Sequence, residues 1–562
     1  MADRYDESLD QREGIDRAAF LKRAGLLGAA TAVGSWGSVG GLASASAAER
    51  RAEAAGSSSQ MVVAGADVIG STLDPQGYAT YSEPASLCLT VLYDTLVTQA
   101  IPPTFAGAKT AFKTGGKYLP RLASSWKSSA DGTKWTFKLN QKATSNFGNH
   151  LTAEDVAWTM NRAMANSSSV PAYYLTSADV KSVTALSADV VEFQLGKPGP
   201  PYFLGLLAQM PLGIIDSVQA KKYATTSDPY ATSWLNSNIA GFGPYEWAGF
   251  NADGGGTLNA RTDYISKPHI SKIVQLAVPE SSNRLELVLS GTADFTDQLS
   301  PSQLQTLRQA GKVGTYIAGV YAAQAFLAMD GSLPQFATPA LRQAIAKTIP
   351  FKELLADVYL GKGLQWKTPI DPWFQGATDK YWNYTLDPSA AQSVFATLPS
   401  SAKAFPLSYA AGDQLGEQIA VLIADSLNAV GLNVSPTGVP PASFSQKRIS
   451  GGLTSWIDDE SGCTPESSLE MLQTFYSSTG LLGGAYHYTN DKLIDSYCQK
   501  IIAAKSPAAS LKLIDAAQKQ LIEDLPVIPL VYTGTAAGYT PKLSGVQQSV
   551  WGNFDYRFFK LA

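Results

Sequence analysis

Alternating apolar and polar positions predict several half-buried strands. Segments 135–140 and 191–195 alternate strictly between the two kinds of residue, as a strand with one buried face requires. The run 526–532 is apolar almost throughout, which predicts a buried strand. Segments with helical periodicity lie between these strands, so the hydrophobic pattern predicts a mixed α/β fold.

Helix starts are marked by side chains that can accept a hydrogen bond from the first turn. Thr152 precedes a segment in which Val156, Met160, Ala163 and Met164 form one apolar stripe. Further helices are predicted from Ser300-Pro301 to Gly311, from Thr338-Pro339, from Asp387-Pro388, from Ser506-Pro507 to about Asp524, and over 414–430. The helix over 414–430 is expected to lead into a strand at 432–434.

Composition places the chain among globular proteins of low net charge. Of the 562 residues, 16% are charged, and the formal net charge is −4. No strong electrostatic field therefore favours nucleic acid or an anionic membrane as a partner. Hydrophobic residues make up 45% of the chain, enough to build real cores. The length predicts two or three domains. The 11 Trp and 25 Tyr residues suit a site that holds organic ligands.

The few cysteines and histidines are too scattered for a metal or redox motif. They are Cys88, Cys463 and Cys498, and His150, His269 and His487. No CxxC or HExxH spacing occurs among them. We therefore expect no metal and no cofactor, and at most one disulfide, whose partners the spacing does not identify.

The N-terminal segment has the pattern of an export signal. Residues 24–48 carry no charge, follow a basic cluster that ends at Arg23, and finish in small residues that suit cleavage. The cluster resembles a twin-arginine motif in which Ala18 replaces the second arginine. A membrane-spanning helix is the alternative, but the stretch is mostly Gly, Ala and Ser. We expect a signal over 1–48, a flexible mature N-terminus over 49–59, and no lipoprotein anchor, because no cysteine ends the stretch.

Two short catalytic motifs are present in an order that does not suit catalysis. Ser124 and Lys127 match S-x-x-K, and residues 113–115 match K-T-G, both motifs of penicillin-binding enzymes. In those enzymes K-T-G comes last, whereas here it comes first, and no S-D-N motif occurs. A secreted serine hydrolase of penicillin-binding type is therefore kept only as the alternative function.

An acidic run follows a tryptophan in the second half of the chain. Asp458, Asp459 and Glu460 come directly after Trp456 and Ile457. Adjacent acids repel each other, and such a run is usually a solvated loop. The other interpretation is a cation-binding group beside an aromatic wall.

A series of short motifs occurs in a fixed order over residues 64–560. They are Leu73-Asp74-Pro75, Leu92-Tyr93-Asp94-Thr95-Leu96-Val97, Pro120-Arg121-Leu122-Ala123-Ser124-Ser125-Trp126, Trp135-Thr136-Phe137-Lys138-Leu139, Leu151-Thr152-Ala153-Glu154-Asp155-Val156, Gly243-Pro244-Tyr245, Leu341-Arg342-Gln343-Ala344-Ile345-Ala346 and Asp524-Leu525-Pro526-Val527-Ile528-Pro529-Leu530. The series resembles family 5 of the bacterial solute-binding proteins, which are peptide and nickel receptors of ABC importers.

The resemblance implies an α/β fold of two hinged lobes, the class II arrangement of periplasmic binding proteins, with a subdomain inserted in the first lobe. The expected parts are lobe I at 60–98, 211–320 and 531–562, the inserted subdomain at 99–210, and lobe II at 321–530. Closure of the lobes would enclose the ligand.

The resemblance also implies ligand-binding residues. In peptide-binding members, an Asp three residues after a Trp holds the α-ammonium of the peptide. Here these residues are Asp459 and Trp456, with Asp458 as the neighbouring candidate. Further candidates for aromatic contacts with the ligand are Tyr78, Tyr81 and Trp373.

We therefore expect an exported, non-enzymatic and monomeric receptor of the periplasm or the cell exterior. It would capture a peptide, or a similar amine-bearing solute, for the membrane subunits of an ABC permease. Receptors of the same fold for a nickel chelate, an oligosaccharide or an opine are alternatives, because ligand size depends on loops that the sequence does not place.

Overall fold

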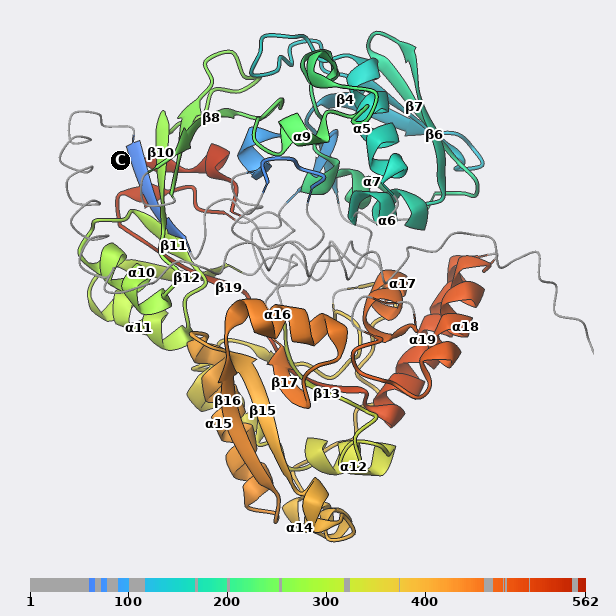
Figure 1. The fold of residues 1–562 in the computed structure, drawn as a ribbon, viewed down its shortest axis with the longest axis vertical. Helices are drawn as coiled ribbons and strands as arrows, with labels where there is room; N and C mark the ends of the chain where they lie inside the picture. The colour runs from blue at the N-terminus through green and yellow to red at the C-terminus, as the bar shows by residue number, and fades with distance from the viewer. Residues whose placement is uncertain are drawn as a thin grey trace, which may run out of the picture.

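The described chain forms two lobes, one above the other in Figure 1. The structure is a computed structural model and describes residues 60–65, 72–77, 89–100, 117–166, 170–199, 203–251, 255–317, 324–372, 374–458, 468–478, 480, 483–504, 506–547 and 554–562. The predicted export signal and the mature N-terminus, residues 1–59, lie outside the described residues.

A seven-stranded sheet lies on the left of the upper lobe in Figure 1, with strand order β12-β19-β11-β1-β10-β9-β8. The strands are β1 (Gln60–Gly65), β8 (Tyr245–Phe250), β9 (Gly256–Ala260), β10 (Lys272–Ala277), β11 (Phe295–Asp297), β12 (Val313–Ile317) and β19 (Thr535–Tyr539). Successive residues of β1 pack on opposite faces of the sheet: Met61 belongs to one hydrophobic cluster, and Val62 belongs to another. Helices α10 (Ser281–Leu289) and α11 (Pro301–Gln309) share the cluster of Val62, so this sheet is buried on both faces.

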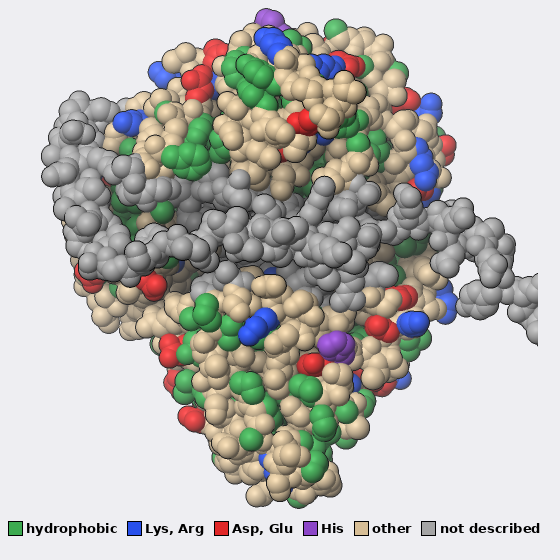
Figure 2. Space-filling model, viewed as in Figure 1, with side chains coloured by type: hydrophobic (Ala, Val, Ile, Leu, Met, Phe, Trp, Pro, Cys, Tyr) green, Lys and Arg blue, Asp and Glu red, His purple; other side chains and the backbone are tan. Residues whose placement is uncertain are grey.

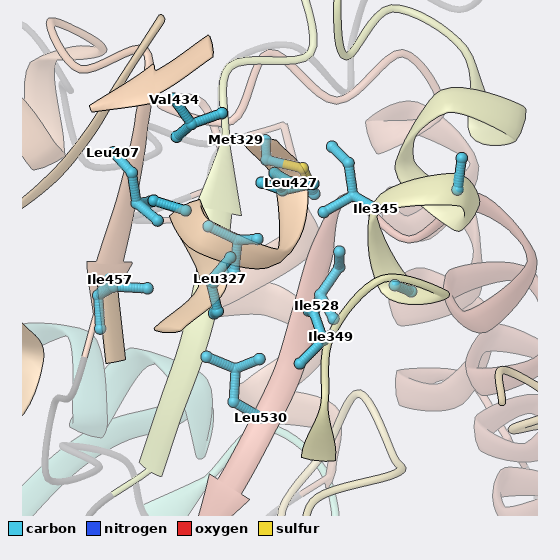
Figure 3. Close-up of a cluster of buried hydrophobic side chains, with 14 of the residues drawn as sticks. Leu327, Met329, Ile345, Ile349, Leu407, Leu427, Val434, Ile457, Ile528 and Leu530 are labelled. Atoms are coloured by element: carbon cyan, nitrogen blue, oxygen red, sulfur yellow. The ribbon is translucent and has the colours of Figure 1, made fainter. Parts of the chain in front are cut away.

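The lower lobe is built on a six-stranded sheet of order β14-β18-β13-β17-β15-β16. Its strands are β13 (Gln324–Met329), β14 (Leu364–Gln365), β15 (Ala404–Ala410), β16 (Asn433–Val439), β17 (Ser455–Asp458) and β18 (Val527–Tyr532). The buried strand predicted at 526–532 is confirmed as β18, whose residues are all buried. Figure 3 shows the hydrophobic cluster on one face, where Leu327, Leu407, Ile457 and Ile528 come from four neighbouring strands.

The last strand of this sheet, β16, is longer than predicted. The sequence pattern indicated only residues 432–434, whereas β16 extends to Val439 and contains Pro436. Proline cannot donate a hydrogen bond to a neighbouring strand and is tolerated at a sheet edge. Because β16 pairs only with β15 among the described residues, its outer side needs no donor, and Pro436 does not end the strand.

A separate four-stranded sheet of order β4-β5-β7-β6 lies in the upper lobe. Its strands are β4 (Ala123–Ser128), β5 (Lys134–Leu139), β6 (Val180–Ser187) and β7 (Val190–Leu195), so the two alternating segments are confirmed as strands. Helix α5 (Ala153–Ala165) packs against it and begins at the predicted cap. Thr152 and Asp155 form a reciprocal capping box, and Asp155 also accepts hydrogen bonds from the backbone and hydroxyl of Ser217.

The other predicted helix starts are also confirmed. Ser300, Thr338, Asp387 and Ser506 each accept a hydrogen bond from the first turn of the helix that follows. These helices are α11, α12 (Pro339–Ala346), α14 (Pro388–Phe395) and α19 (Pro507–Asp524), and the predicted helix at 414–430 is α15 (Gln414–Asn428). A polar cap followed by proline satisfies an orphan amide and fixes the backbone angle of the first residue, and both effects are local.

The remaining elements connect these layers. They are β2 (Val97–Gln99), β3 (Tyr118–Pro120), α6 (Val170–Ser177), α7 (Phe203–Leu207), α8 (Ser217–Ala220), α9 (Thr232–Leu235), α13 (Phe351–Glu353), α16 (Pro441–Ser450), α17 (Ser468–Met471), α18 (Asp491–Ile502), β20 (Leu543–Ser544) and β21 (Lys560–Leu561). Short 3-10 turns lie at 210–212, 221–223, 400–402 and 556–558, and π-helical turns at 354–358 and 472–476. Within the part of the chain that the structure describes, no helix combines the length and apolar character needed to cross a membrane.

A buried ion network fastens the C-terminal segment to the upper lobe. Arg121 donates to Asp94 and to Asp555, each at 2.9 Å. Arg557 reaches the same two carboxylates, Asp94 at 3.2 Å and Asp555 at 2.7 Å. Burial by itself would raise the pKa of Asp94, but Arg557 and Arg121 outweigh burial and hold this pKa below its ordinary value. The negative charges of two carboxylates are thus compensated by the positive charges of two guanidinium groups inside the protein.

Candidate ligand-binding site

Only two of the six predicted ligand-binding residues, Trp456 and Asp458, fall within the described residues. The other four, Asp459, Tyr78, Tyr81 and Trp373, lie outside them. Trp456 is completely buried in β17 and packs against Tyr486, with ring centroids 5.8 Å apart. In this conformation Trp456 is a core residue that offers no surface to a ligand.

Asp458, at the end of β17, is buried and bonded within the protein. Its carboxylate lies 3.0 Å from a guanidinium nitrogen of Arg448 on α16 and accepts a hydrogen bond from the indole N–H of Trp456 at 3.3 Å. The side chain of Asp458 is 1% exposed and that of Arg448 is 12% exposed. The solvated-loop interpretation therefore does not hold for Asp458, whose negative charge is neutralised by Arg448.

The strand ends at this edge of the sheet bring further polar groups together. Strand β13 is antiparallel to β17 and β18, so its first residue, Gln324, lies beside Tyr532 at the end of β18. Both side chains donate to buried Asp371, Tyr532 at 2.9 Å and Gln324 at 3.2 Å. Asp371 belongs to no motif that the sequence singled out, because its partners are remote along the chain.

Glu470 is a second acid that sequence reasoning missed. It lies on α17 and is 1% exposed, and neither carboxyl oxygen has a hydrogen-bond partner among the described residues. Burial raises the pKa of this carboxyl well above its usual range, which favours the protonated form. Ser468 and Met471 on the same turn contact the segment near Asp371, since Ser468 donates to the carbonyl of Gln375 and Met471 accepts from the amide of Asp371.

The serine and lysine of the S-x-x-K match are not arranged as a catalytic pair. The hydroxyl of Ser124 donates to the carbonyls of Lys138 and Leu139, at 3.0 and 3.4 Å, in the β4–β5 ladder. Lys127 is an exposed residue three positions further along the same strand, beyond a bulge between Ala123 and Ser125. Residues 113–115, the K-T-G match, lie outside the described residues.

The described residues hold no group of three or more side chains suited to bind a metal ion. Cys498 is a free, buried thiol, and burial raises its pKa to about 12, which suppresses its reactivity. Cys88 and Cys463 lie outside the described residues. On the face shown in Figure 2, acidic and basic side chains are scattered over both lobes and form no large patch of one sign.

Known proteins share both sequence and fold with this chain. Residues 117–482 match the family described as "Bacterial extracellular solute-binding proteins, family 5 Middle". The probable D,D-dipeptide-binding periplasmic protein DdpA of Escherichia coli K12 is 26% identical over 406 residues, which cover 72% of this chain and 77% of that protein.

Two solved structures superpose on this chain with a TM-score of 0.74 and 21% identity. One is the periplasmic binding protein DppA of Helicobacter pylori in complex with the peptide STSA, which covers 89% of this chain and 98% of its own. The other is MoaA of A. tumefaciens R10 in complex with mannopinic acid, with coverage of 90% and 99%. The predicted two-lobed α/β fold is thereby confirmed.

Proposed function

The chain belongs to family 5 of the bacterial extracellular solute-binding proteins, and on this premise we propose that it is an exported receptor for peptides. It captures the peptide between its two lobes and delivers it to an ABC permease without chemical change. The relative DdpA is named as a dipeptide-binding protein, and the structural neighbour DppA holds a peptide. The receptor acts as a monomer.

The observation that carries this proposal is the neutralisation of Asp458 by Arg448 at the end of β17. The acidic run 458–460 begins at this strand end, and the protein itself supplies a counter-charge to its first member. We propose that Asp459, the next residue, binds the α-ammonium of the peptide. Trp456 supports the strand end from the core, and Tyr78, Tyr81 and Trp373 contribute aromatic contacts.

A receptor for a non-peptide solute is the second candidate, because MoaA holds mannopinic acid in the same fold. Native mass spectrometry of freshly purified protein distinguishes the two, since a co-purified ligand reveals its own mass. A peptide supports the proposal, whereas an opine, a sugar or a metal chelate contradicts it. A chromogenic β-lactam tests the hydrolase alternative, and neither turnover nor acylation of Ser124 is expected.

Ligand should stabilise the protein and make it more compact. A ligand that binds only the native state stabilises it by RT ln(1 + [L]/Kd), about 2.7 kcal/mol at a hundredfold excess over Kd. We expect binding members of a di- to pentapeptide panel to raise the melting temperature and to reduce the radius of gyration in small-angle scattering. Identical scattering curves at saturation would rule out capture by lobe closure.

The mature protein should begin between Ala45 and Glu49. The small residues that end the uncharged N-terminal stretch provide the cleavage site of an export signal. N-terminal sequencing of protein recovered from outside the cytoplasm of the native host checks this expectation. Protein that retains Met1 and stays in the membrane fraction would contradict export with cleavage.

A further inference from the structure

Glu470 on α17 is a buried acid without a counter-charge. It is 1% exposed, and neither of its carboxyl oxygens has a hydrogen-bond partner among the described residues. Other buried carboxylates of this protein contact a guanidinium group, as Asp94 and Asp458 do. Native proteins satisfy nearly all buried polar groups, and a buried charge without a partner is costly. Glu470 therefore fits its surroundings only as the neutral acid.

The adjoining elements leave Glu470 without electrostatic compensation. The next residues along the chain, Met471 and Leu472, belong to a hydrophobic cluster with members on β13, β17, β18, α16, α18 and α19. Ionisable groups of these elements and of the segment 369–375 are paired elsewhere: Asp371 with Tyr532, Asp458 with Arg448, Asp495 with Ser478, and Asp524 with Tyr488. Accordingly, burial alone raises the pKa of Glu470 well above its ordinary value of 4.5.

Only neutral hydrogen bonds are found between the described residues of the segment 369–375 and those of α17 with the π-helical turn that follows it. They are Ser468 Oγ to the carbonyl of Gln375 at 2.7 Å, Tyr476 Oη to the carbonyl of Pro369 at 2.7 Å, and the amide of Asp371 to the sulfur of Met471 at 3.0 Å. Each neutral hydrogen bond contributes modestly to stability, whereas an unpaired buried charge costs much more. Ionisation of Glu470 would therefore favour a state in which α17 is undocked.

Helix α17 is connected to the candidate ligand-binding site in two ways. It begins ten residues after the end of β17, and Asp459, the proposed ammonium anchor, lies in between. Through Met471 it also contacts Asp371, whose carboxylate accepts hydrogen bonds from Gln324 and Tyr532 at the strand ends. In Figure 1, α17 lies at the top of the lower lobe and faces the upper lobe. Undocking of α17 would therefore disturb the side of the lower lobe that the peptide is proposed to contact.

We propose that α17 is a pH-sensitive switch, which stays docked while Glu470 is protonated and is released when Glu470 ionises, so that peptide binding weakens as the pH rises. The effect on peptide binding rests on the proposed function, whereas the release of α17 does not. The backbone supports a mobile role, because α17 passes directly into a π-helical turn, a rare conformation that is frequent at functional sites.

The direction of the pH effect follows from proton binding. The docked state keeps the proton of Glu470 at pH values where the solvated carboxyl has lost it. The stability gained in this way is complete below the ordinary pKa of 4.5 and is lost as the pH rises through the raised pKa of the docked state. Over this range the docking equilibrium constant should fall by up to about tenfold per pH unit.

Hydrogen exchange of the amides in 468–478 measures the docking of α17. The test compares the parent with Glu470→Met and Glu470→Gln, neither of which ionises. At each pH between about 5.5 and 8.5 the exchange rate of the parent is divided by that of the variant, and this ratio should rise by up to about tenfold per pH unit for both variants. Glu286→Met, which removes an exposed glutamate of α10, is the matched control and should give a constant ratio.

A second measurement uses the parent protein and does not depend on the stability of the Met variant. Infrared spectroscopy distinguishes a protonated carboxyl from a carboxylate. At about pH 7, where exposed carboxyls are ionised, the parent should retain a protonated carboxyl band that is absent in Glu470→Gln. Absence of this band from the parent would overturn the proposal, and so would exchange ratios that stay constant with pH.

Calorimetry with the tightest peptide of the panel tests the link to ligand binding. Between about pH 5.5 and 8.5 the affinity of the parent should fall relative to that of Glu470→Met, by no more than about tenfold per pH unit. If the parent binds no peptide, the proposed function fails, while hydrogen exchange still decides whether α17 responds to pH. If both proteins bind and their affinities change equally with pH, α17 does not control binding and the switch is wrong.

Discussion

Replacing Asp459 by alanine should weaken peptide binding by roughly 30-fold to several thousandfold. The α-ammonium would be left buried without a counter-charge, and truncating one partner of such a pair weakens the binding free energy by about 2–5 kcal/mol. Each tenfold change in Kd corresponds to about 1.4 kcal/mol, which gives the expected range. The melting temperature without peptide should change little, because substitutions away from buried pairs and the core usually change stability by no more than about 0.5 kcal/mol. Isothermal titration calorimetry with the tightest peptide of the panel measures the change.

N-acetylation of the peptide provides the control, because it removes the charge that Asp459 is proposed to bind. The acetylated peptide should bind the parent weakly, and Asp459→Ala should not weaken it much further. Asp458→Asn should behave differently, since it leaves Arg448 partly buried without its anion and mainly lowers stability. Unchanged affinity in Asp459→Ala, or indifference to acetylation, would show that Asp459 is not the amine anchor.

Arg557→Met should lower the free energy of unfolding by about 3–5 kcal/mol, because breaking a buried ion pair leaves an uncompensated charge. Arg557 contacts Asp94 and Asp555, which are 0% and 1% exposed. With Arg557 removed, Arg121 alone would face both carboxylates. Urea denaturation of parent and variant at pH 7 measures the loss.

The exposed pair between Lys134 and Glu192 serves as the matched control. These side chains are 3.5 Å apart and 52% and 23% exposed, so Lys134→Met should cost no more than about 1 kcal/mol. If the free energy of unfolding fell by a similar amount in Arg557→Met and Lys134→Met, the buried network would contribute no more to stability than an exposed ion pair.

The effect of Arg557→Met should also depend on pH. The pKa of Asp94 is lowered in the folded protein, so the stability that it contributes is complete above its unfolded value of about 3.9. This contribution is lost as the pH falls through the folded pKa. The difference between parent and Arg557→Met should therefore shrink below about pH 4, and a difference that stays constant would count against this role of Asp94.

Local chemistry made many elements predictable from the sequence. The caps at Thr152, Ser300 and Ser506 act within one helical turn, so their effect does not depend on the rest of the fold. The alternating segments became β5 and β7 because a two-residue period fits a sheet with one buried face. The prediction was too short at β16, since only the sheet order reveals that Pro436 lies on an edge strand.

The candidate site was predictable only in outline. The resemblance pointed to the acidic run after Trp456, but it did not distinguish the roles of neighbouring acids. Asp458 is neutralised by Arg448, ten residues away, through the packing of α16 against the sheet. Asp371 meets Tyr532 across 161 residues because two antiparallel strands end at the same edge.

By itself, then, the sequence determined what arises within a few residues: the helix caps, the strand periodicity and the motif order of the family. The tertiary structure alone decided which polar groups are satisfied. Gln303 and Gln99 are the same residue type and similarly buried, yet Gln303 donates to Ser281, 22 residues away, besides capping its own helix at Ser300, and Gln99 has no side-chain partner among the described residues. Hydrogen bonds act over about 3 Å, so their partners depend on which distant segments the fold brings together.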